Sequence, residues 1–323
     1  METNRTDLHR PARNGRDTGE RRPPADGGTP QPLEVYYSPA YHDTDVVFDT
    51  TVKSRHVAEL IAGREDCRIV APDPVDASDL VLVHDDAYVR AVRDGTPIDL
   101  AGSNGIGWDN RLYLAVATST GGIVQAALRA LATGSITASL SSGLHHAGPE
   151  SGRGFCTFNG IALAALLALR AGALRVLIID LDAHCGGGTA RIIDGVEGIE
   201  QIDVSTQRFD QYASRPDARL RISGADGYLG TVERMLDEVP DPAGVDLVIY
   251  NAGMDVHEEA GGDAGFTTDL VVDREHLVLE WAVAQGLPVA FTLAGGYTGH
   301  GRDLAGVAEL HLETFRAAAA VAG

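Results

Sequence analysis

The 323-residue chain is predicted to form a single three-layer α/β/α domain with a mostly parallel sheet. Apolar runs of strand length alternate with helix-like stretches from about residue 35 onward, without a convincing linker or an internal repeat. Such alternation is typical of a parallel sheet covered by helices on both faces. Single α/β domains often reach this length, so no second domain is required.

The expected elements follow from apolar periodicity and from the glycine, proline and aspartate residues that interrupt it. Buried strands are expected at 136–140, 177–179, 245–250 and 288–293. Helices are expected at 112–132, 161–171, 228–239, 274–285 and 304–322.

The first 32 residues differ from the rest of the chain. They are rich in Arg, Asp, Gly and Pro and almost lack large apolar residues, so we expect a disordered tail at 1–32 and a structured domain at 33–323. The tail lacks the apolar centre of a secretion signal, and we expect no later run to span a membrane. Cys67, Cys156 and Cys185 form no disulfide framework, which favours a reducing cytoplasm.

The formal net charge of −20 argues against direct binding to a nucleic-acid backbone. It is compatible with a cationic substrate, although solubility alone would account for it. The sequence indicates no oligomeric state.

A metal site is expected where the run 177–179 ends. Asp180, Asp182 and His184 follow it at alternate positions, so in extended chain their side chains share one face. Buried carboxylates are costly unless they are compensated, which favours a bound cation. The alternative is a turn in which an aspartate caps a helix.

A second strand end repeats this pattern. The run 245–250 breaks at a glycine-containing turn, and Asp255 follows. Because ligands bind beyond the carboxyl ends of parallel strands, Asp255 can reach the cavity of Asp182 and His184. Two carboxylates and one imidazole leave coordination positions for water and substrate. Zn²⁺ fits this set, and Fe²⁺, Co²⁺ or Mn²⁺ also remain open.

Candidate acid–base groups lie after the run 136–140. The adjacent His145 and His146 titrate near neutrality, although such a pair alone is more often structural than catalytic. Gly154 and Phe155 then bring an aromatic ring and a close backbone approach near them. Tyr297, after the last strand, is placed to donate a hydrogen bond to an oxyanion.

From Val35 to the C-terminus the chain resembles the histone deacetylase family, the zinc-dependent branch of the arginase/deacetylase superfamily. The resemblance rests on the following segments: VYYSPAY, KSRHVAELI, VHDDAYVRAVRDG, HHA with GFCTFN, DLDAH, GMD and GGY. It implies an arginase/deacetylase-like fold and metal-assisted hydrolysis of a linear amide.

The resemblance also assigns roles to residues. Asp182, His184 and Asp255 match the metal ligands, and Tyr297 matches the tyrosine that polarises the scissile carbonyl. His146 matches the general base and acid, His145 its electrostatic companion, and Asp180 the carboxylate that orients His145. The implied substrate pocket comprises Gly154, Phe155, Phe209 and Gly296. A structural K⁺ or Na⁺ site is implied at the carbonyls of Asp180, Asp182 and His184, with Ser205.

The chain departs from the family pattern in three places. Gly187 stands where a polar residue would orient the general base, so we expect His146 to be less basic or held by another group, and an Asp at position 187 to raise turnover. Cys185 replaces a histidine and is expected to be a buried thiol. Phe209 or Tyr212 is expected to supply the second aromatic wall, and Glu258 and Glu259 are added near the pocket mouth.

We therefore expect a cytoplasmic deacetylase of a small-molecule N-acetylated amine, such as an acetylated polyamine or a biosynthetic intermediate. The alternative within the class is a deacetylase of acetyl-lysine peptides. A Mn²⁺ ureohydrolase is less favoured because its two-metal site needs more Asp and His ligands. From another class, a catalytically weakened homologue would keep the metal and act as a binding module.

Overall fold

A computed structural model describes residues 31–45 and 49–322, so residues 1–30 of the expected tail lie outside the described part. The described chain contains one eight-stranded sheet of order β2-β1-β3-β8-β7-β4-β5-β6, in which all pairings are parallel. The strands are β1 (Leu33–Tyr36), β2 (Cys67–Val70), β3 (Ile136–Ser139), β4 (Val176–Asp180), β5 (Ile199–Ser205), β6 (Ala218–Ile222), β7 (Leu247–Asn251) and β8 (Val289–Thr292). The predicted parallel α/β fold is confirmed.

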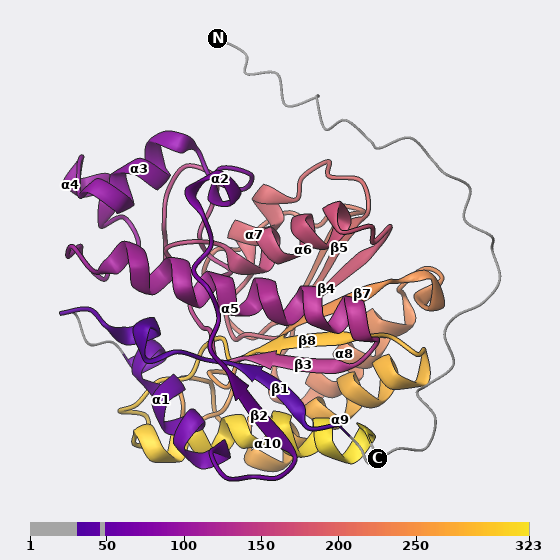
Figure 1. Ribbon diagram of the computed structural model, residues 1–323. Helices are drawn as coiled ribbons and strands as arrows, with labels where there is room; N and C mark the ends of the chain where they lie inside the picture. Colours follow the sequence, from indigo (N-terminus) through magenta and orange to yellow (C-terminus); the bar gives the residue numbers. More distant parts are fainter. Residues whose placement is uncertain (1–30, 46–48, 323) are drawn as a thin grey trace. The chain divides into compact units, whose positions relative to one another are not determined.

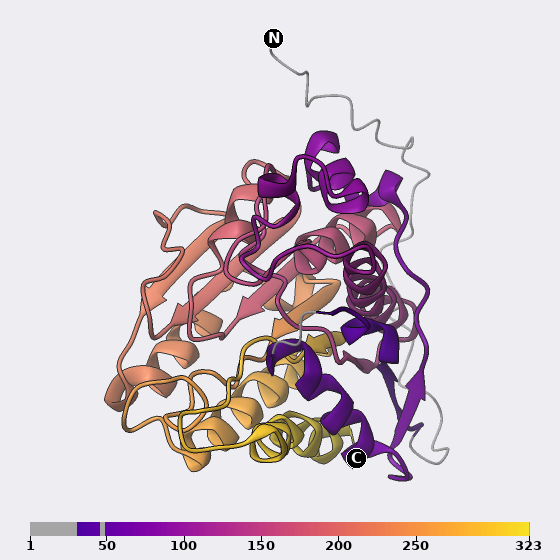
Figure 2. The same ribbon diagram turned by 90° about the vertical axis from the view of Figure 1, so that its left-hand side faces the viewer.

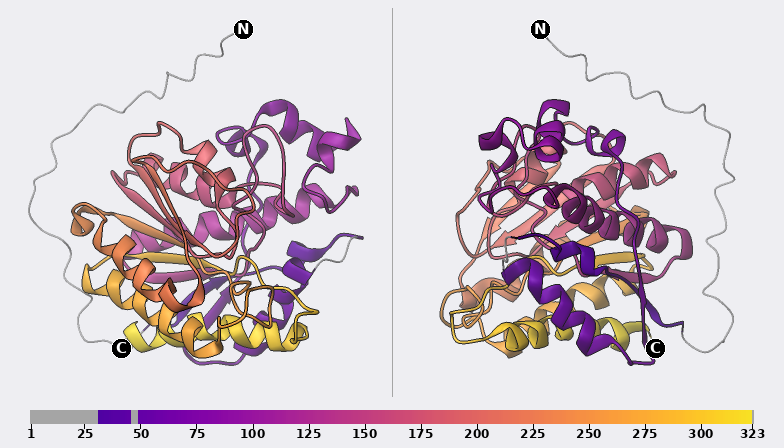
Figure 3. Two further views of the ribbon diagram at one scale, coloured as in Figure 1. Left: turned by 180° about the vertical axis from the view of Figure 1, so that it is seen from behind. Right: turned by 60° about the vertical axis from the view of Figure 1, so that its left-hand side comes forward.

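Helices cover both faces of this sheet (Figures 1 and 2). They are α1 (Asp49–Ile61), α2 (Ala77–Leu80), α3 (Asp86–Asp94), α4 (Ile98–Ala101), α5 (Leu112–Thr133), α6 (Gly160–Arg170), α7 (Gly187–Ile192), α8 (Tyr228–Asp237), α9 (Thr268–Ala284) and α10 (Leu304–Ala322). Helices α5 and α6 pack on one face, and α1, α8, α9 and α10 pack on the other, as the view from behind also shows (Figure 3).

The two sides of the sheet form separate apolar cores. In β4, Leu177 and Ile179 belong to the core under α8–α10, whereas Val176 and Ile178 belong to the core under α5 and α6. This division follows from the two-residue period of a strand, which sends successive side chains to opposite faces. A run that is apolar at every position is therefore buried on both faces.

Two expectations about helices need correction. Helix α9 begins six residues before the expected 274, because the Thr267 side chain caps it by accepting a hydrogen bond from Leu270 N at 3.4 Å. One helix of the described residues, α5, is long and apolar enough to cross a membrane, contrary to the expectation that no run is. However, 67% of the most apolar 18-residue stretch of α5 is buried, as in the core helix of a globular fold.

Strands β3, β8, β7 and β4 are neighbours in the middle of the sheet. Their carboxyl ends lead into the segments that carry His145 and His146, Tyr297, Asp255, and Asp182 with His184. Because all four strands run in the same direction, these segments meet at one edge of the sheet.

Candidate active site

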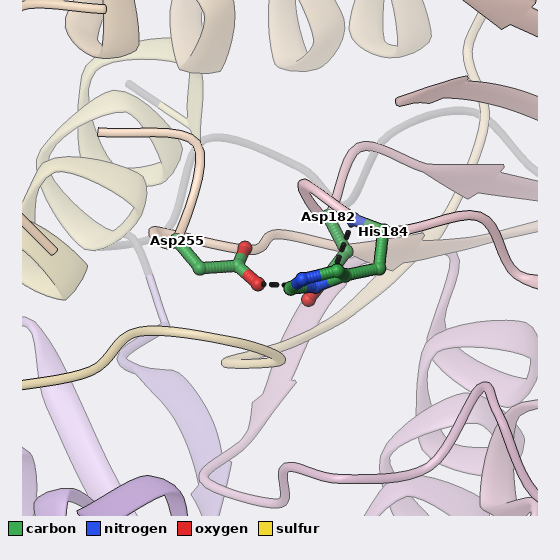
Figure 4. A group of neighbouring side chains, drawn as sticks. All are labelled: Asp182, His184 and Asp255. Atoms are coloured by element: carbon green, nitrogen blue, oxygen red, sulfur yellow. Dashed lines mark hydrogen bonds and ion pairs between the residues drawn. The ribbon is translucent and has the colours of Figure 1, made fainter. Parts of the chain in front are cut away.

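Asp182, His184 and Asp255 form a cluster beyond β4 and β7 (Figure 4). His184 Nδ1 lies 3.2 Å from Asp182 Oδ1 and 3.1 Å from Asp255 Oδ2. One ligand atom from each residue lies within 4.8 Å of the other two. The structure thus brings together the three residues that the sequence predicted as metal ligands.

Backbone amides fix the two carboxylates of this cluster. Asp255 Oδ1 accepts a hydrogen bond from Ala183 N at 3.0 Å, and Asp182 Oδ2 accepts one from Gly295 N at 2.8 Å. A Cβ atom on Gly295 would lie 2.1 Å from Asp255 Oδ2, so only glycine allows the backbone to approach the carboxylates this closely. The turn after β8 therefore forms one wall of the cluster.

The charges in this cluster fit a cation. Asp255 is fully buried and its Oδ2 has no hydrogen-bond donor within the described residues, although His184 Nδ1 lies near it. Burial and the neighbouring Asp182 raise the pKa of Asp255, which shows that two adjacent buried carboxylates repel each other. Although burial opposes it, Asp182 and Asp255 raise the pKa of His184 to about 11. A divalent cation would replace this proton and compensate both carboxylates.

His145 and Asp180 form the first of two buried histidine–aspartate pairs. His145 Nδ1 lies 2.9 Å from Asp180 Oδ2, and Asp180 Oδ1 accepts a further hydrogen bond from Asn251 Nδ2 at 2.8 Å. Burial disfavours the imidazolium, but Asp180 and Asp182 outweigh it and raise the pKa of His145 to about 10. His145 is thus suited to carry a positive charge, and Asp180 lies in contact with it, as the predicted orienting role requires.

His146 forms the second pair, with a residue that the sequence analysis did not identify. Its Nδ1 lies 3.3 Å from Asp210 Oδ2, and both side chains are buried. Burial and the adjacent His145 lower the pKa of His146 to about 4, with Asp210 acting in the opposite direction. A neutral His146 whose Nδ1–H points at Asp210 leaves Nε2 free to accept a proton. The only sequence signal for Asp210 was its place within the divergent loop 205–217.

Three neighbouring elements hold the loop that carries the histidine pair. Thr189 N of α7 donates to His145 O at 2.9 Å, and the Asn159 side chain at the start of α6 donates to His145 O at 3.3 Å. His84 Nδ1 donates to Gly148 O at 2.8 Å, and its Nε2 accepts from Asn159 N at 2.9 Å. The buried His84, from the segment before α3, therefore links the histidine loop to the cap of α6.

Aromatic rings border the site. Phe209 lies edge-on to His146 at 4.8 Å between ring centroids and to His184 at 5.9 Å. Gly154 lies between them, because a Cβ atom there would be 2.6 Å from His146 Cδ2 and 2.8 Å from Phe209 Cε1. Phe155, which is 37% exposed, lines the same pocket as the histidine pair. The expected positions of Gly154, Phe155 and Phe209 at the site are thus supported.

Tyr297 also lines this pocket, and its ring lies edge-on to His184 at 6.5 Å between centroids. Burial, Asp255 and Asp182 raise the pKa of Tyr297, so its hydroxyl stays protonated and can donate a hydrogen bond. The expected pocket role of Gly296 is not supported, since Gly295 lines the pocket instead. A Cβ atom on Gly296 would lie 3.1 Å from both Val307 Cγ1 and His311 Nε2, on the side of α10.

Four other divergent side chains lie apart from the reacting groups. The Tyr212 hydroxyl accepts from Gln201 Nε2 at 3.0 Å, so Phe209 is the second aromatic wall. Cys185 is fully buried, as expected for a structural thiol. Glu259 pairs with Arg302 at 3.1 Å, and Glu258 accepts from Gly265 N at 2.8 Å. Glu258 therefore stabilises its own loop, whereas Glu259 links that loop to the segment between β8 and α10.

Ser205 ends β5 beside β4, where the structural K⁺ or Na⁺ site was expected, and that site remains a prediction. The Ser205 hydroxyl donates to Asp203, a fully buried carboxylate that pairs in register with Asp180. Burial and Asp180 raise the pKa of Asp203 well above its usual value. Asp203 thus adds a second acid to this region.

Comparison with known proteins agrees with this geometry. A family model for the histone deacetylase domain matches residues 48–213. An uncharacterized protein of Picosynechococcus is 33% identical over 73% of this chain and 81% of its own length. A probable deacetylase of Methanothermobacter thermautotrophicus is 27% identical over 82% of this chain and 86% of its own length. The crystal structure of the HDA15 HD domain shares the fold, with a TM-score of 0.72, 19% identity, and coverage of 89% of this chain and 91% of that domain. The chain belongs to the histone deacetylase family.

Proposed function

We propose that this protein is a zinc-dependent deacetylase that hydrolyses the N-acetyl amide of a small-molecule amine. The observation that carries the proposal is that a three-ligand cluster and two histidine–aspartate pairs lie together, with Asp182, both histidines and Tyr297 lining one pocket. These groups supply what amide hydrolysis requires: a cation site, a base, an acid and an oxyanion donor.

The reaction follows from the roles that the side chains can fill. A divalent cation held by Asp182, His184 and Asp255 would supply a Lewis acid and lower the pKa of a water molecule. His146 Nε2 takes a proton from the attacking water and later delivers it to the leaving amine. The Tyr297 hydroxyl donates to the oxyanion that develops from the acyl oxygen, and the cationic His145 adds further electrostatic stabilisation.

The small-molecule part of the proposal rests on the mouth of the pocket. The Arg153 guanidinium lies 5.1 Å from the centroid of the Phe209 ring, so a cation covers one wall of the entrance. The loop 205–217 that carries Phe209 differs from the family pattern. Glu258 accepts from Gly265 N within its own loop, and Glu259 pairs with Arg302 of the segment before α10. Both carboxylates therefore have partners in the protein, and they add no support for a polycationic substrate such as an acetylated polyamine. A biosynthetic intermediate fits this entrance better if the part of the molecule that carries the acetylated amine is neutral or bears an acidic group.

A substrate panel on one metal-loaded preparation tests the proposal. It should contain acetylated polyamines, acetylated amino sugars, N-acetyl amino acids and acetyl-lysine peptides, with Tyr297→Phe as the inactive control. We expect turnover of a small acetylated amine to exceed that of every peptide. A strong preference for peptides would instead support a protein deacetylase. Full metal occupancy without hydrolysis of any acylated amine would support a binding module.

The metal and the compartment are part of the same proposal. Two carboxylates and one imidazole suit Zn²⁺ and also Fe²⁺, Co²⁺ or Mn²⁺, and reconstitution of the metal-free protein with each ion will rank them by turnover. The three cysteines are free thiols, which supports a reducing compartment such as the cytoplasm. Cell fractionation tests this assignment, and recovery outside the cytoplasm would reject it.

A further inference from the structure

We infer that Asp210 is the positioning residue for His146, that Arg191 holds Asp210 in place, and that the absence of a side chain at Gly187 leaves the space that Asp210 occupies. This inference deepens the proposed hydrolase function and rests on it for the kinetic consequence. The family pattern places a base-orienting residue at position 187, at the start of α7, whereas here the contact comes from a loop between β5 and β6.

The contacts of Asp210 are directional. Oδ2 faces His146 Nδ1 at 3.3 Å and also accepts from Arg191 Nη2 at 3.3 Å. Oδ1 accepts from Arg191 Nη1 at 2.9 Å and lies 3.7 Å from Arg153 Nε. Arg191 Nη2 also donates to the His146 carbonyl oxygen at 3.4 Å. One guanidinium therefore ties the carboxylate to the backbone of the residue that the carboxylate orients.

The loop backbone is shaped for this contact. Asp210 has a φ of 57°, in the left-handed region that few residues other than glycine, asparagine and aspartate adopt readily. The loop is tied to the end of β4 by a hydrogen bond from Cys185 N to Phe209 O at 3.0 Å. Aspartate is thus one of the few residues with a side chain that suit this backbone position and also supply a carboxylate.

Gly187 provides the space that Asp210 occupies. A Cβ atom at position 187 would lie 2.2 Å from the Asp210 carbonyl oxygen and 2.8 Å from its Cγ. A side chain at position 187 would therefore collide with Asp210, because Asp210 already occupies that space.

The same loop also carries the aromatic wall. Phe209 contacts the rings of His146 and His184, and the next residue orients His146. A loop movement that shifts the wall must therefore shift the base. Fixing Nδ1–H toward a carboxylate sets both the tautomer and the ring orientation, and leaves Nε2 for proton transfer.

The test compares Asp210→Ala with Asp210→Asn, because an Asn side-chain oxygen can still accept from Nδ1–H whereas Ala cannot. Asp194→Asn is the matched control, since Asp194 also pairs with an arginine, Arg215 at 3.2 Å, but is 68% exposed. For Asp210→Ala we expect kcat to fall about 10–100-fold, with KM and metal content unchanged. Asp210→Asn should retain more kcat than Asp210→Ala, and Asp194→Asn should match the parent.

A second measurement does not depend on hydrolysis. ¹⁵N NMR of the histidine rings reports the tautomer, and the His146 signals are assigned by their loss in His146→Gln. We expect the Nδ1–H form in the parent and in Asp210→Asn, and a population of the Nε2–H form in Asp210→Ala. The inference is overturned if the tautomer is unchanged in Asp210→Ala, if kcat is unchanged, or if Asp210→Asn is as impaired as Asp210→Ala. If the tautomer shifts but no acylated amine is ever hydrolysed, the positioning role stands and the proposed function fails.

Discussion

The backbone of Gly187 lies against Asp210 so closely that a Cβ atom on the glycine would be 2.2 Å from the aspartate carbonyl oxygen. This contact changes the interpretation of Gly187. From the sequence, Gly187 marks the loss of a residue that orients the general base. In the structure, it marks the place where another loop supplies that residue.

Substitution of Gly187 should therefore impair the protein, which reverses our expectation that an Asp there would raise turnover. Gly187→Ala and Gly187→Asp should each cost about 1–3 kcal/mol of stability through overpacking and displace the 205–217 loop. We expect lower kcat at unchanged metal content. Chemical denaturation and kinetics measure both effects, with Gly224→Ala as the control, because a Cβ atom there meets nothing within 4 Å. Higher turnover in Gly187→Asp would show that Asp210 does not fill the orienting role.

Removing any one of the three ligand side chains should remove the metal. Asp182→Ala, His184→Ala and Asp255→Ala each leave two ligands, so we expect most of the bound metal and of the activity to be lost. Metal analysis after gel filtration measures this loss. Asp263→Asn is the matched control, since Asp263 is exposed on the segment that follows Asp255. Full metal retention in Asp255→Ala would mean that the second strand end does not contribute a ligand.

Tyr297→Phe should separate catalysis from metal binding. The change deletes one hydroxyl and keeps the ring beside His184, so metal content should match the parent. Loss of an oxyanion donor typically lowers kcat by about 10²–10³-fold. Steady-state kinetics on the best substrate of the panel will measure the change. A kcat within a few-fold of the parent would assign oxyanion stabilisation to other groups.

His84 should make the fold sensitive to acid. Burial lowers the pKa of His84 to about 4, from 6.5 in its ordinary state. The neutral ring is therefore the native form, and its contribution is fully present above pH 6.5 and is lost as the pH falls toward 4. The difference corresponds to about 3 kcal/mol.

His84→Gln isolates this effect, because a glutamine amide can donate to Gly148 O and accept from Asn159 N without titrating. We expect the stability of His84→Gln relative to the parent to be constant above pH 6.5 and to improve by up to about 3 kcal/mol by pH 4. Urea denaturation at several pH values provides the comparison. A difference that does not change with pH would mean that His84 accepts a proton without losing its contacts.

The sequence by itself determined the architecture and the metal cluster. The run 177–179 is apolar at every position and is followed by polar residues and glycines, which predicts a strand inside a helix-covered parallel sheet. Parallel strands end at the same edge, so Asp182, His184 and Asp255 had to meet there once β4 and β7 were neighbours. Periodicity is a property of consecutive residues and can be read before folding, and the alternation of strands with helices predicts the parallel direction.

Only the tertiary structure decided which group orients His146. Asp210 lies 64 residues from His146, in a loop with no repeating pattern, and its direction depends on a positive φ and on packing against Gly187. The start of α9 and the link through His84 are of the same kind, since each depends on a single side-chain hydrogen bond. Such contacts are set by the path of irregular chain through three dimensions, which no local periodicity encodes.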